Sequence, residues 1–549
     1  MRSAWLKSVM NKIWVRQCVR LVLLLAAFGW LTYNAQAQSP TMDEQNHMAR
    51  GYALLRTGDP RLSIEHPPLI NLLEALPLGG GVILPLDDPS WEAAEWYHFA
   101  DVFLWHVNTL PERMVFLSRM PVVAMTLLLG SLVTRWGRAL AGDRTALIAT
   151  ALVLLDPNIL AHGSLATTDL GIALTTLLAA YAIWRVSERI TLRRIIGAGL
   201  AVGVMLASKT SAVAFWACFG LLFVAGVLGS CRGRALIKQV VWRGVLYGLI
   251  TVIGLLVLWT AYAWQIGPVL DGGVPIPAGT YWRGLAAVFQ NVQGERMAYL
   301  LGETRLGGWP IYFPVVFAVK TPLPVLVLLV LAGWRVLRTR PYRLSVFLLA
   351  PVAIYWLSVL VSDLNLGYRH LLPTLPLLYL WIASSVGRSG SAFWRRLSAG
   401  LVVWLALETV LIAPYFLAYF NPVAGGPENG WRVLADSNID WGQDLVHLSD
   451  YLAANAPNET VRLSWFGTGY PEHYGIDYEP LPGLPHHFDL WFEPPTFNEA
   501  QPEPGLYAIS VSNLVELPLI DKHFFTYFRA REPDVRIGYS IYIYRVGMD

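Results

Sequence analysis

The stretch RRIIGAGLAVGVMLASKTSAVAFWACFGLLFVAGVLGSCRGR, residues 193–234, decides the fold class of this chain. It contains two apolar runs, near 195–208 and 211–230, joined by a short polar turn that holds Lys209. Each run is close to the length of a membrane-spanning helix. Arginines stand at both outer ends of the pair, and short loops rich in Lys and Arg are typical of the cytoplasmic side. The stretch therefore predicts a helical hairpin whose two ends lie on the same side of a membrane.

Similar apolar runs recur along most of the chain. Its 549 residues are 55% hydrophobic and only 14% charged, with a mean hydropathy of +0.45, whereas soluble domains carry about 25% charged residues. We predict an α-helical polytopic membrane protein with about eleven transmembrane helices, because each span needs about 20 predominantly apolar residues. The predicted spans lie near residues 17–34, 119–134, 145–161, 170–186, 195–208, 211–230, 244–265, 310–333, 344–362, 370–387 and 398–418.

Basic residues indicate the orientation of these spans. They cluster before the first span and then after every second one, and such loops stay on the cytoplasmic side. We therefore expect a multi-pass protein of the cell (plasma) membrane with a cytoplasmic N-terminus and an extracytoplasmic C-terminus. The net charge of +3 gives no reason to expect nucleic acid as a partner. The clusters are Lys7, Lys12, Arg16 and Arg20; Arg135, Arg138 and Arg144; Arg185, Arg189, Arg193 and Arg194; Arg232, Arg234, Lys238 and Arg243; Arg335, Arg338, Arg340 and Arg343; and Arg388, Arg395 and Arg396.

The first apolar segment has a second interpretation. LVLLLAAFGWLTYNAQAQ, residues 21–38, is an apolar run followed by an Ala-x-Ala-like stretch, which is also typical of a cleaved signal peptide. Retention and cleavage both leave the orientation of the later spans unchanged, so the two readings stay open at this point.

The composition changes near residue 419. Residues 1–418 form the predicted transmembrane domain, and residues 419–549 are polar and Pro-rich. This tail contains the strand-like runs VRLSWFG, GLYAISVS and YSIYIYRV and a helical stretch from Asp444 to Ala456. We expect it to form a small C-terminal α/β soluble domain on the extracytoplasmic face.

The first outer loop, residues 35–118, holds the first candidate site. Asp43 and Glu44 form an adjacent pair of acids just after the first span. Acids there can simply favour the first turn of a helix, or they can serve chemistry. Further along the loop, leucines at helical spacing indicate a helix that lies along the membrane interface. These leucines are Leu69, Leu72, Leu73 and Leu76.

Charged residues at the outer ends of later spans favour the chemical reading. Such groups are costly at membrane depth and usually mark a site or pair within the bundle. A carboxylate can take the proton of an alcohol acceptor, and cations can hold a phosphate leaving group. These residues are Asp169 and His162 near the third and fourth spans, Arg369 and His370 at the tenth, and the cations Lys209 and Lys320. For Lys209 and Lys320, snorkelling toward headgroups remains the alternative.

Six sequence segments together resemble the GT-C superfamily of polyprenyl-phosphate-sugar glycosyltransferases. The similarity covers roughly residues 40–380 and is closest to the branch of the dolichyl-phosphate-mannose protein mannosyltransferases and the lipid A aminoarabinose transferase. The segments are the acid pair at 43–44, HPPL (66–69), HGSLATTD (162–169), ASKT (207–210), AVKTPLP (318–324) and NLGYRHLLP (365–373). The segment YFNPVAGGPENGWRVLADSNIDWGQDL (419–445) also looks like one found in bacterial members that carry a soluble tail, without an agreed role.

The resemblance implies roles for individual residues. It makes Asp43 the catalytic base or acceptor-binding acid, with Glu44 beside it and Asp169 as a second acid. Donor phosphate binding falls to Arg369, Lys209, Lys320 and His370, and substrate binding to His66 and His162.

The resemblance also implies a reaction. A monosaccharide would pass from a polyprenyl-phosphate donor to a hydroxyl acceptor, on a protein, lipid or envelope glycan, by an inverting single displacement on the extracytoplasmic face. Neither a cofactor nor a metal is expected.

The chain departs from its relatives in three places. Glu65-His66 replaces the lysine or other residue that many relatives have before the proline pair, the β-trefoil insertion of the protein mannosyltransferases is absent, and no Trp-Trp-Asp run is present. Asparagine-linked transfer is therefore not expected.

Two other functions compete with the transferase. A transporter or flippase of lipid-linked saccharides would also need a charged outer cavity, but it would need broken helices at the midplane as well. Glu408, inside the eleventh span, is the one candidate coupling residue, and pairing within the bundle is the simpler explanation. A binding module in the tail would not require so many spans as an anchor.

Overall fold

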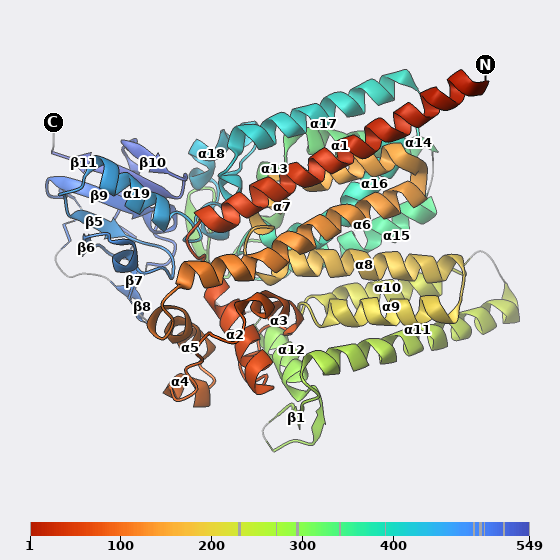
Figure 1. Cartoon of the computed structure of the whole chain (residues 1–549), viewed down its shortest axis with the longest axis horizontal. Coiled ribbons are helices and arrows are strands. Elements are labelled where there is room, and N and C mark those ends of the chain that lie inside the picture. The colour runs from red at the N-terminus through yellow and green to blue at the C-terminus, as the bar shows by residue number, and fades with distance from the viewer. Residues whose placement is uncertain are drawn as a thin grey trace.

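The computed structural model describes residues 2–228, 232–270, 272–291, 296–339, 342–389, 391–486, 489–492, 497–498, 500–519 and 522–547. Figure 1 shows a bundle of long helices with a small sheet region at one end. The start of α1, the C-terminal ends of α8, α10, α14 and α16 and the N-terminal ends of α9, α11, α15 and α17 lie at the opposite end. The long helices are α1 (Arg2–Ala37), α6 (Pro111–Leu154), α8 (Thr168–Glu188), α9 (Leu192–Leu206), α10 (Ala212–Ala225), α11 (Gly233–Ala261), α14 (Leu323–Thr339), α15 (Tyr342–Leu360), α16 (Leu375–Gly387) and α17 (Ala392–Ile412).

All eleven predicted spans overlap helices of the structure. By length and apolar composition alone, six of the described helices can cross a membrane, or seven if one bent pair counts as a span. The polytopic helical fold is therefore confirmed, while the count of about eleven stays a prediction. The helix α6 contains the predicted span 119–134 and the first part of the span 145–161, whose remainder lies in α7 (Pro157–His162). Non-helical backbone at Ala141 and Gly142 folds α6 into a hairpin. A Cβ on Gly130 would lie 2.8 Å from Leu154, which places the two arms side by side.

One predicted span does not form a single continuous helix, so the prediction is wrong on that point. The segment 310–333 divides into α13 (Tyr312–Lys320) and α14, which meet at an angle of 110°. Pro322 lies in the break. Proline lacks the backbone N–H that a helix needs and clashes with the preceding turn, so the chain turns sharply just after Lys320.

The first helix packs as part of the bundle. Ala27, Leu31 and Ala35 are buried in the main core, and Arg20 pairs with Asp143 in the bend of α6 at 3.1 Å. Asn34 donates to the carbonyl oxygen of Pro414 at 2.9 Å. These contacts extend from Arg20 to Ala35, so this part of α1 packs against the other helices of the bundle.

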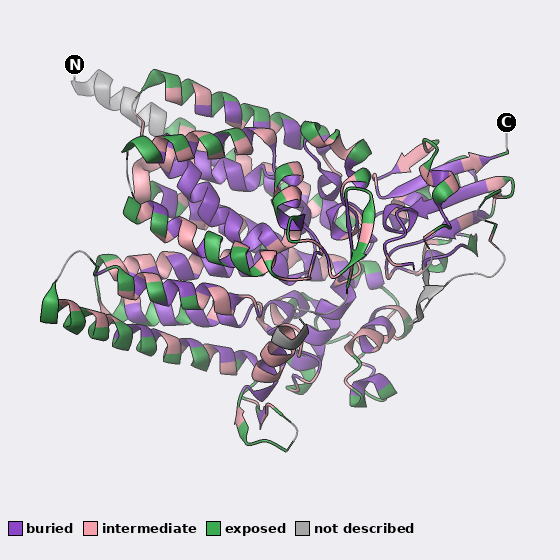
Figure 2. Ribbon diagram, turned by 180° about the vertical axis from the view of Figure 1, so that it is seen from behind, coloured by how far each residue is buried: buried purple, intermediate pink, exposed green. Residues whose placement is uncertain are grey.

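The outer helices present apolar side chains outward. Figure 2 shows that the middle helices are buried on most faces, whereas outer helices expose one side. Valines and leucines of α11 and α17 occupy the exposed sides, among them Val245, Val252, Leu407 and Leu411. Exposed apolar faces of this kind suit contact with lipid chains, which are as apolar as the side chains themselves.

The first outer loop folds into short helices beside the bundle. The predicted leucine helix is α3, in which Ile70, Asn71, Glu74 and Ala75 are buried, while Leu76, directly after it, is exposed.

Short helices and hairpins occur along the whole protein. The short helices are α2 (Glu44–Thr57), α3 (Leu69–Ala75), α4 (Pro89–Glu92), α5 (Trp96–Asp101), α7 (Pro157–His162), α12 (Gly279–Asn291), α18 (Gly426–Asn429), α20 (Val511–Leu514) and α21 (Thr526–Arg529). Three two-stranded hairpins are β1 (Ile266–Pro268) with β2 (Pro275–Pro277), β3 (Met297–Leu300) with β4 (Glu303–Leu306), and β7 (Leu484–His486) with β8 (Asp489–Phe492).

The tail contains the predicted mixture of strands and helix. Five strands form one sheet in the order β10-β11-β9-β5-β6, in which β5 runs parallel to β6 and β9 and the remaining pairs are antiparallel. The alternating apolar residues of the strands pack against α19 (Leu445–Asn455) through Leu448 and Leu452. The strands are β5 (Val461–Ser464), β6 (Tyr478–Pro480), β9 (Gly505–Ser510), β10 (Val535–Ile537) and β11 (Ile541–Val546). The small C-terminal sheet region is thus confirmed.

Helices α9 and α11 approach each other at glycines. A Cβ on Gly203 would lie 2.5 Å from Cβ of Val257 and 2.6 Å from the carbonyl oxygen of Gly254. Small residues allow two helix backbones to come this close in a membrane protein.

We predict that Gly203→Ala destabilises the protein by about 1–3 kcal/mol, because the added methyl group must push the two helices apart. The matched control is Gly197→Ala on the same helix, where a Cβ meets nothing within 4 Å; it should be neutral or stabilising, since alanine is the better helix former. Thermal unfolding of the purified protein in detergent measures both changes. Equal effects of the two substitutions would contradict the close packing.

Candidate functional site

A cavity of about 500 Å³ lies between the outer loop, the α9–α10 turn, α12 and the segment before α16. Its wall combines charged groups with apolar ones. It is lined by Asp43, Asn46, His47, Arg50, Ile64, Glu65, His66, Trp96, Lys209, Thr210, Ser211, Gly284, Ala287, Val288, Arg296, Tyr355, Leu364, Leu366, Arg369 and His370. Five of the nine residues predicted from the sequence are therefore in the wall: Asp43, His66, Lys209, Arg369 and His370.

Four charged residues form a continuous chain at this cavity. Nη1 of Arg369 donates to Oδ2 of Asp43 at 2.6 Å and lies 4.0 Å from Oδ2 of Asp169. Nζ of Lys209 bonds the other oxygen of Asp169 at 2.6 Å. Asp169 is buried and stands behind the two cations. The predicted convergence of the first acid with residues more than 120 positions away is therefore observed.

Local structure explains how each member is presented. Asp43 immediately precedes α2, and Asp169 lies in the first turn of α8, where the helix dipole favours an acid. Lys209 occupies the turn between α9 and α10. Arg369 lies in a short 3₁₀ helix, Tyr368–Thr374, which starts after Gly367 with φ of 129°.

Glu44 has a different environment from its neighbour Asp43. It is fully buried and accepts two hydrogen bonds from Arg119, at 2.8 and 2.6 Å, and others from Thr41 and the backbone of Ala166. Although burial favours the neutral acid, the charge and hydrogen bonds of Arg119 hold the pKa of Glu44 below its usual value. Glu44 does not line the cavity, so the structure corrects the expectation that it stands in the active site beside Asp43. It fixes the turn that carries Asp43.

Two further predicted residues also lie away from the cavity wall. Nζ of Lys320 is buried and donates to the carbonyl oxygens of Leu417 and Asn438, so it ties backbone together and is not available to a donor phosphate. His162 is buried against the ring of Trp441, with ring centroids 6.0 Å apart. The sequence placed both residues near the site but could not show that later segments of the chain cover them.

The structure adds Arg50, Glu65 and Trp96 to the cavity wall, and the sequence had assigned none of them to a site. Arg50 bonds Glu65 at 2.8 Å and lies 4.2 Å from the ring of Trp96. Burial opposes ionisation of Glu65, but the charge of Arg50 holds the pKa of this acid well below its usual range. The position of Glu65 directly before the HPPL segment was the available signal.

Two neutral histidines stack at the same wall. The rings of His47 and His66 are 5.7 Å apart and nearly parallel. Burial lowers the pKa of His47 to about 4 and that of His66 to about 3. Both rings are therefore uncharged at neutral pH; Nδ1 of His47 lies 3.0 Å from Oδ1 of Asn71, whereas Nδ1 of His66 has no partner among the described residues.

Asp436, from the tail, adds a further acid near this centre. Burial raises its pKa to about 6, against the opposing charge of Arg369. Its backbone φ of 57° is unusual for a residue with a side chain, and such strain is found most often at functional sites. No sequence pattern indicated Asp436 other than its place in the 419–445 segment.

Several buried polar atoms at the cavity lack a hydrogen-bond partner among the described residues. They are Nε of Arg369, Nε2 of His370, Nδ1 of His66 and Oδ1 of Asn46. Buried polar groups in native proteins are nearly always paired. Four unpaired ones on a single cavity indicate a place for a polar ligand.

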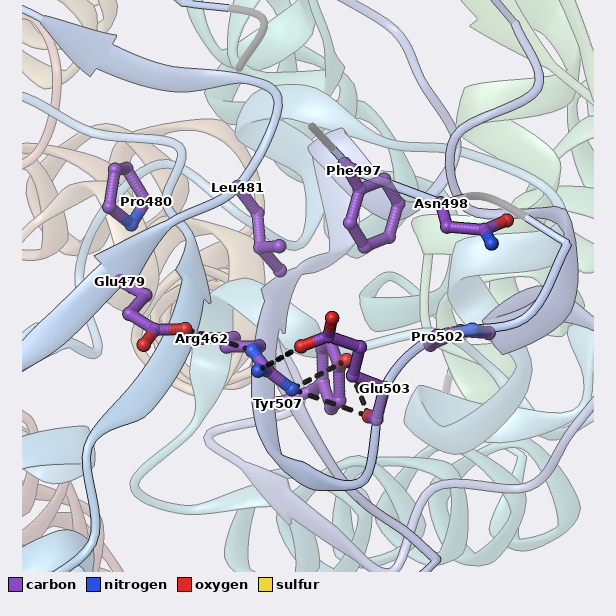
Figure 3. A pocket seen from close by; sticks show the side chains of 9 residues that line it. All are labelled: Arg462, Glu479, Pro480, Leu481, Phe497, Asn498, Pro502, Glu503 and Tyr507. Carbon is purple, nitrogen blue, oxygen red and sulfur yellow. Dashed lines mark hydrogen bonds and ion pairs between the residues drawn. The ribbon is translucent and has the colours of Figure 1, made fainter. Parts of the chain in front are cut away.

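The tail has a smaller cavity of about 200 Å³, which Figure 3 shows. The guanidinium of Arg462, which lines this cavity, is already bonded to Glu479, Glu503 and the hydroxyl of Tyr507. All its lining residues belong to the tail, and none is a predicted site residue.

Metal ligation can be considered from the side chains alone. Within the described part of the chain, no group of three or more His, Cys, Asp or Glu residues is arranged to hold a metal ion. The expectation that catalysis needs no metal stays a prediction.

Comparisons with known proteins give a family match over part of the chain and a similarity of fold. Residues 99–259 match the family described as dolichyl-phosphate-mannose-protein mannosyltransferase. The whole chain is similar to the crystal structure of ArnT from Cupriavidus metallidurans bound to undecaprenyl phosphate, at 12% identity and a TM-score of 0.51, over 95% of this chain and 97% of that one. At this identity the likeness establishes the fold. A comparison with curated proteins finds no match.

Two further structures are more distant. The apo state of the same ArnT gives a TM-score of 0.48 at 12% identity, covering 98% of both chains. The apo oligosaccharyltransferase of Archaeoglobus fulgidus gives 0.43 at 12% identity, over 80% of this chain and 58% of that one. Neither match carries a further argument.

We predict that Glu44→Gln lowers the unfolding free energy by about 3–5 kcal/mol, because it leaves the buried guanidinium of Arg119 without its counter-charge. The control is Glu92→Gln, which removes an exposed partner of Arg61 and should cost less than about 1 kcal/mol. Denaturant or thermal unfolding in detergent measures both. A Glu44→Gln protein as stable as the control would show that this pair does not hold the Asp43 turn.

Proposed function

We propose that the chain is a membrane glycosyltransferase of the GT-C type, which moves a monosaccharide from a polyprenyl-phosphate carrier to a hydroxyl acceptor. The match of residues 99–259 to the mannosyltransferase family and the fold similarity to ArnT support this proposal. The observation that carries this proposal is a row of ion-paired residues at a cavity with unpaired polar atoms. The row is Asp43, Arg369, Asp169 and Lys209. It offers a base and two cations within one hollow. The solved ArnT is bound to undecaprenyl phosphate, and we extend this class of carrier lipid to the present chain.

In the proposed mechanism the donor phosphate binds to Arg369 and Lys209. The free Nε of Arg369 can meet a phosphate oxygen while Nη1 keeps its bond to Asp43. Guanidinium groups are suited to this, since they present several donors in one plane. The two cations then hold the negative charge that grows on the phosphate as the glycosidic bond breaks. A phosphate leaves without help from a general acid.

Asp43 is the proposed base. The acceptor hydroxyl attacks the anomeric carbon from the side opposite the phosphate, its oxygen bonds to that carbon, and Oδ of Asp43 takes the proton. The bond between the anomeric carbon and the phosphate oxygen breaks, and the polyprenyl phosphate leaves with its charge on the two cations. A single displacement of this kind inverts the anomeric configuration. No bound metal is required for these steps.

The apolar part of the cavity wall suits the lipid portion of the donor. Ile64, Val288, Leu364 and Leu366 lie in the wall together with the charged groups. A polyprenyl chain dissolves in the membrane and can enter sideways between helices. We propose that the cavity opens on the extracytoplasmic side of the plasma membrane. The C-terminal ends of α8, α10, α14 and α16, near which basic residues cluster in the sequence, lie at the other end of the bundle.

The direct test is transfer of radiolabel from a panel of undecaprenyl-phosphate monosaccharides to cell-envelope membranes by the purified protein. Asp43→Asn should lower turnover by about 10²- to 10⁴-fold, because the acceptor loses its base. Asp59→Asn, an exposed acid of the same outer loop that pairs with Arg61, should leave turnover unchanged. Normal turnover by Asp43→Asn would remove this residue from the mechanism. Added chelator should not change the rate.

Arg369→Lys should raise the KM for the lipid donor about ten- to hundredfold, because lysine keeps the charge but loses charge-assisted hydrogen bonds. The KM for the acceptor should stay as in the wild type. Arg61→Lys, which changes a guanidinium of the outer loop away from the cavity, is the matched control. An unaltered donor KM for Arg369→Lys would argue against phosphate binding at this residue.

A further inference from the structure

The tail contributes a segment, ADSNIDWGQDL at residues 435–445, that reaches the charged centre of the membrane-embedded part. We call it the clamp segment. Trp441 within it is 1% exposed, and its ring lies 4.3 Å from the guanidinium carbon of Arg369. An aromatic face against a guanidinium restricts the plane in which its donors lie and favours the charged form.

The clamp segment also holds the backbone on which Arg369 stands. The side-chain oxygen of Asn438 accepts from the backbone N–H of Tyr368 at 3.0 Å. The hydroxyl of Ser437 donates to the carbonyl oxygen of Leu366. Between these two bonds lies Gly367, where a Cβ would come within 2.7 Å of Oγ of Ser437. The turn and the segment are therefore in close contact on both sides of the glycine.

The other half of the clamp segment holds the turn that carries Asp43. The backbone N–H of Met42 donates to the carbonyl oxygen of Trp441 at 3.0 Å, and that of Ser39 to the oxygen of Gln443 at 3.1 Å. The hydroxyl of Ser39 donates to the oxygen of Gly442 and accepts from the N–H of Leu445. Ser39 and Met42, which lie directly before Asp43, are thus held by backbone groups of the tail.

Side chains of the clamp segment anchor it to the sheet region. Oδ2 of Asp440 accepts from the N–H of Ser512 at 2.8 Å, and Oδ2 of Asp444 accepts from the hydroxyl of Ser540 at 2.6 Å. Ser512 lies shortly after strand β9, and Ser540 lies directly before strand β11. The sheet therefore supports the segment, and the segment supports both turns.

We propose that the clamp segment positions Arg369 and Asp43 relative to each other, and that Trp441 is a positioning residue that orients the Arg369 guanidinium for the donor phosphate. This inference rests on the proposed function. Trp441 itself need not touch the substrate. Its effect on the reaction passes through the plane and charge of the guanidinium.

The test compares Trp441→Leu, Trp441→Phe and Trp431→Leu in the full chain. Trp431 is the matched control because it is also buried in the tail under a guanidinium, that of Arg432 at 4.5 Å, but Arg432 does not line the cavity. Two quantities are measured for each variant. One is the affinity for undecaprenyl phosphate alone, from the ligand-induced rise in melting temperature; the other is the donor KM and kcat.

Trp441→Leu should weaken undecaprenyl phosphate binding and raise the donor KM by about five- to thirtyfold, as expected for a lost buried cation–π contact. Trp441→Phe keeps an aromatic face and should restore most of the affinity. Trp431→Leu should leave both quantities unchanged even where it lowers the melting temperature. The acceptor KM should not respond to any of the three.

Two results would overturn the inference. One is an unchanged affinity and donor KM in a folded Trp441→Leu protein; the other is an equal loss in Trp431→Leu, which would mean that the tail acts only through general stability. If Trp441→Leu does not fold, Trp441→Met takes its place in the same comparison, because methionine fills much of the space but offers no aromatic face to the guanidinium. Failure of the proposed function looks different, since the wild type would then neither bind undecaprenyl phosphate nor transfer sugar.

Discussion

The guanidinium of Arg369 is the interaction on which the site depends. It meets Asp43 at 2.6 Å, Asp169 at 4.0 Å and the face of Trp441 at 4.3 Å, so three distant parts of the chain converge on one group. A buried cation is costly unless it is paired and hydrogen-bonded. The two acids and the indole face together provide that pairing, and they still leave Nε unpaired among the described residues. The centre is therefore stable without a ligand and also ready for one.

The charges at the centre balance in pairs. Asp43 and Asp169 oppose Arg369 and Lys209, so the empty cavity carries no large excess of either sign at this point. A phosphodiester that enters adds one negative charge, which weakens the hold of Arg369 on Asp43 because the guanidinium is shared. In the proposed reaction, Arg369 therefore contacts the donor phosphate and the Asp43 carboxylate at the same time.

The sequence predicted those members of the site that are charged residues in apolar surroundings. Asp43, Lys209 and Arg369 stand out because charge is costly at membrane depth, and the alternation of basic loops places them at one end of the bundle. The same reasoning misplaced Glu44 and Lys320. Their partners are Arg119, 75 positions away, and the backbone at Leu417 and Asn438, about 100 positions away. The spacing of residues within one sequence segment contains no information about such distant partners. In the sequence, a cation that faces a cavity therefore looks the same as a cation that faces carbonyl oxygens.

The fold shows the same division between local and distant information. Hydrophobic runs and strand alternation are local, and they predicted the helices and the strands β5, β9 and β11. The bend between α13 and α14 depends on how Pro322 is used, because a proline can kink a span or end it. The clamp segment is the extreme case: its residues are ordinary loop residues in sequence, and their role exists only through backbone groups of residues 39–42 and 366–368. A tail that bonds to both turns of the charged centre cannot move independently of it. The separation into a membrane part and an appended soluble part, natural from composition, therefore does not describe the contacts of the charged centre, to which both parts contribute.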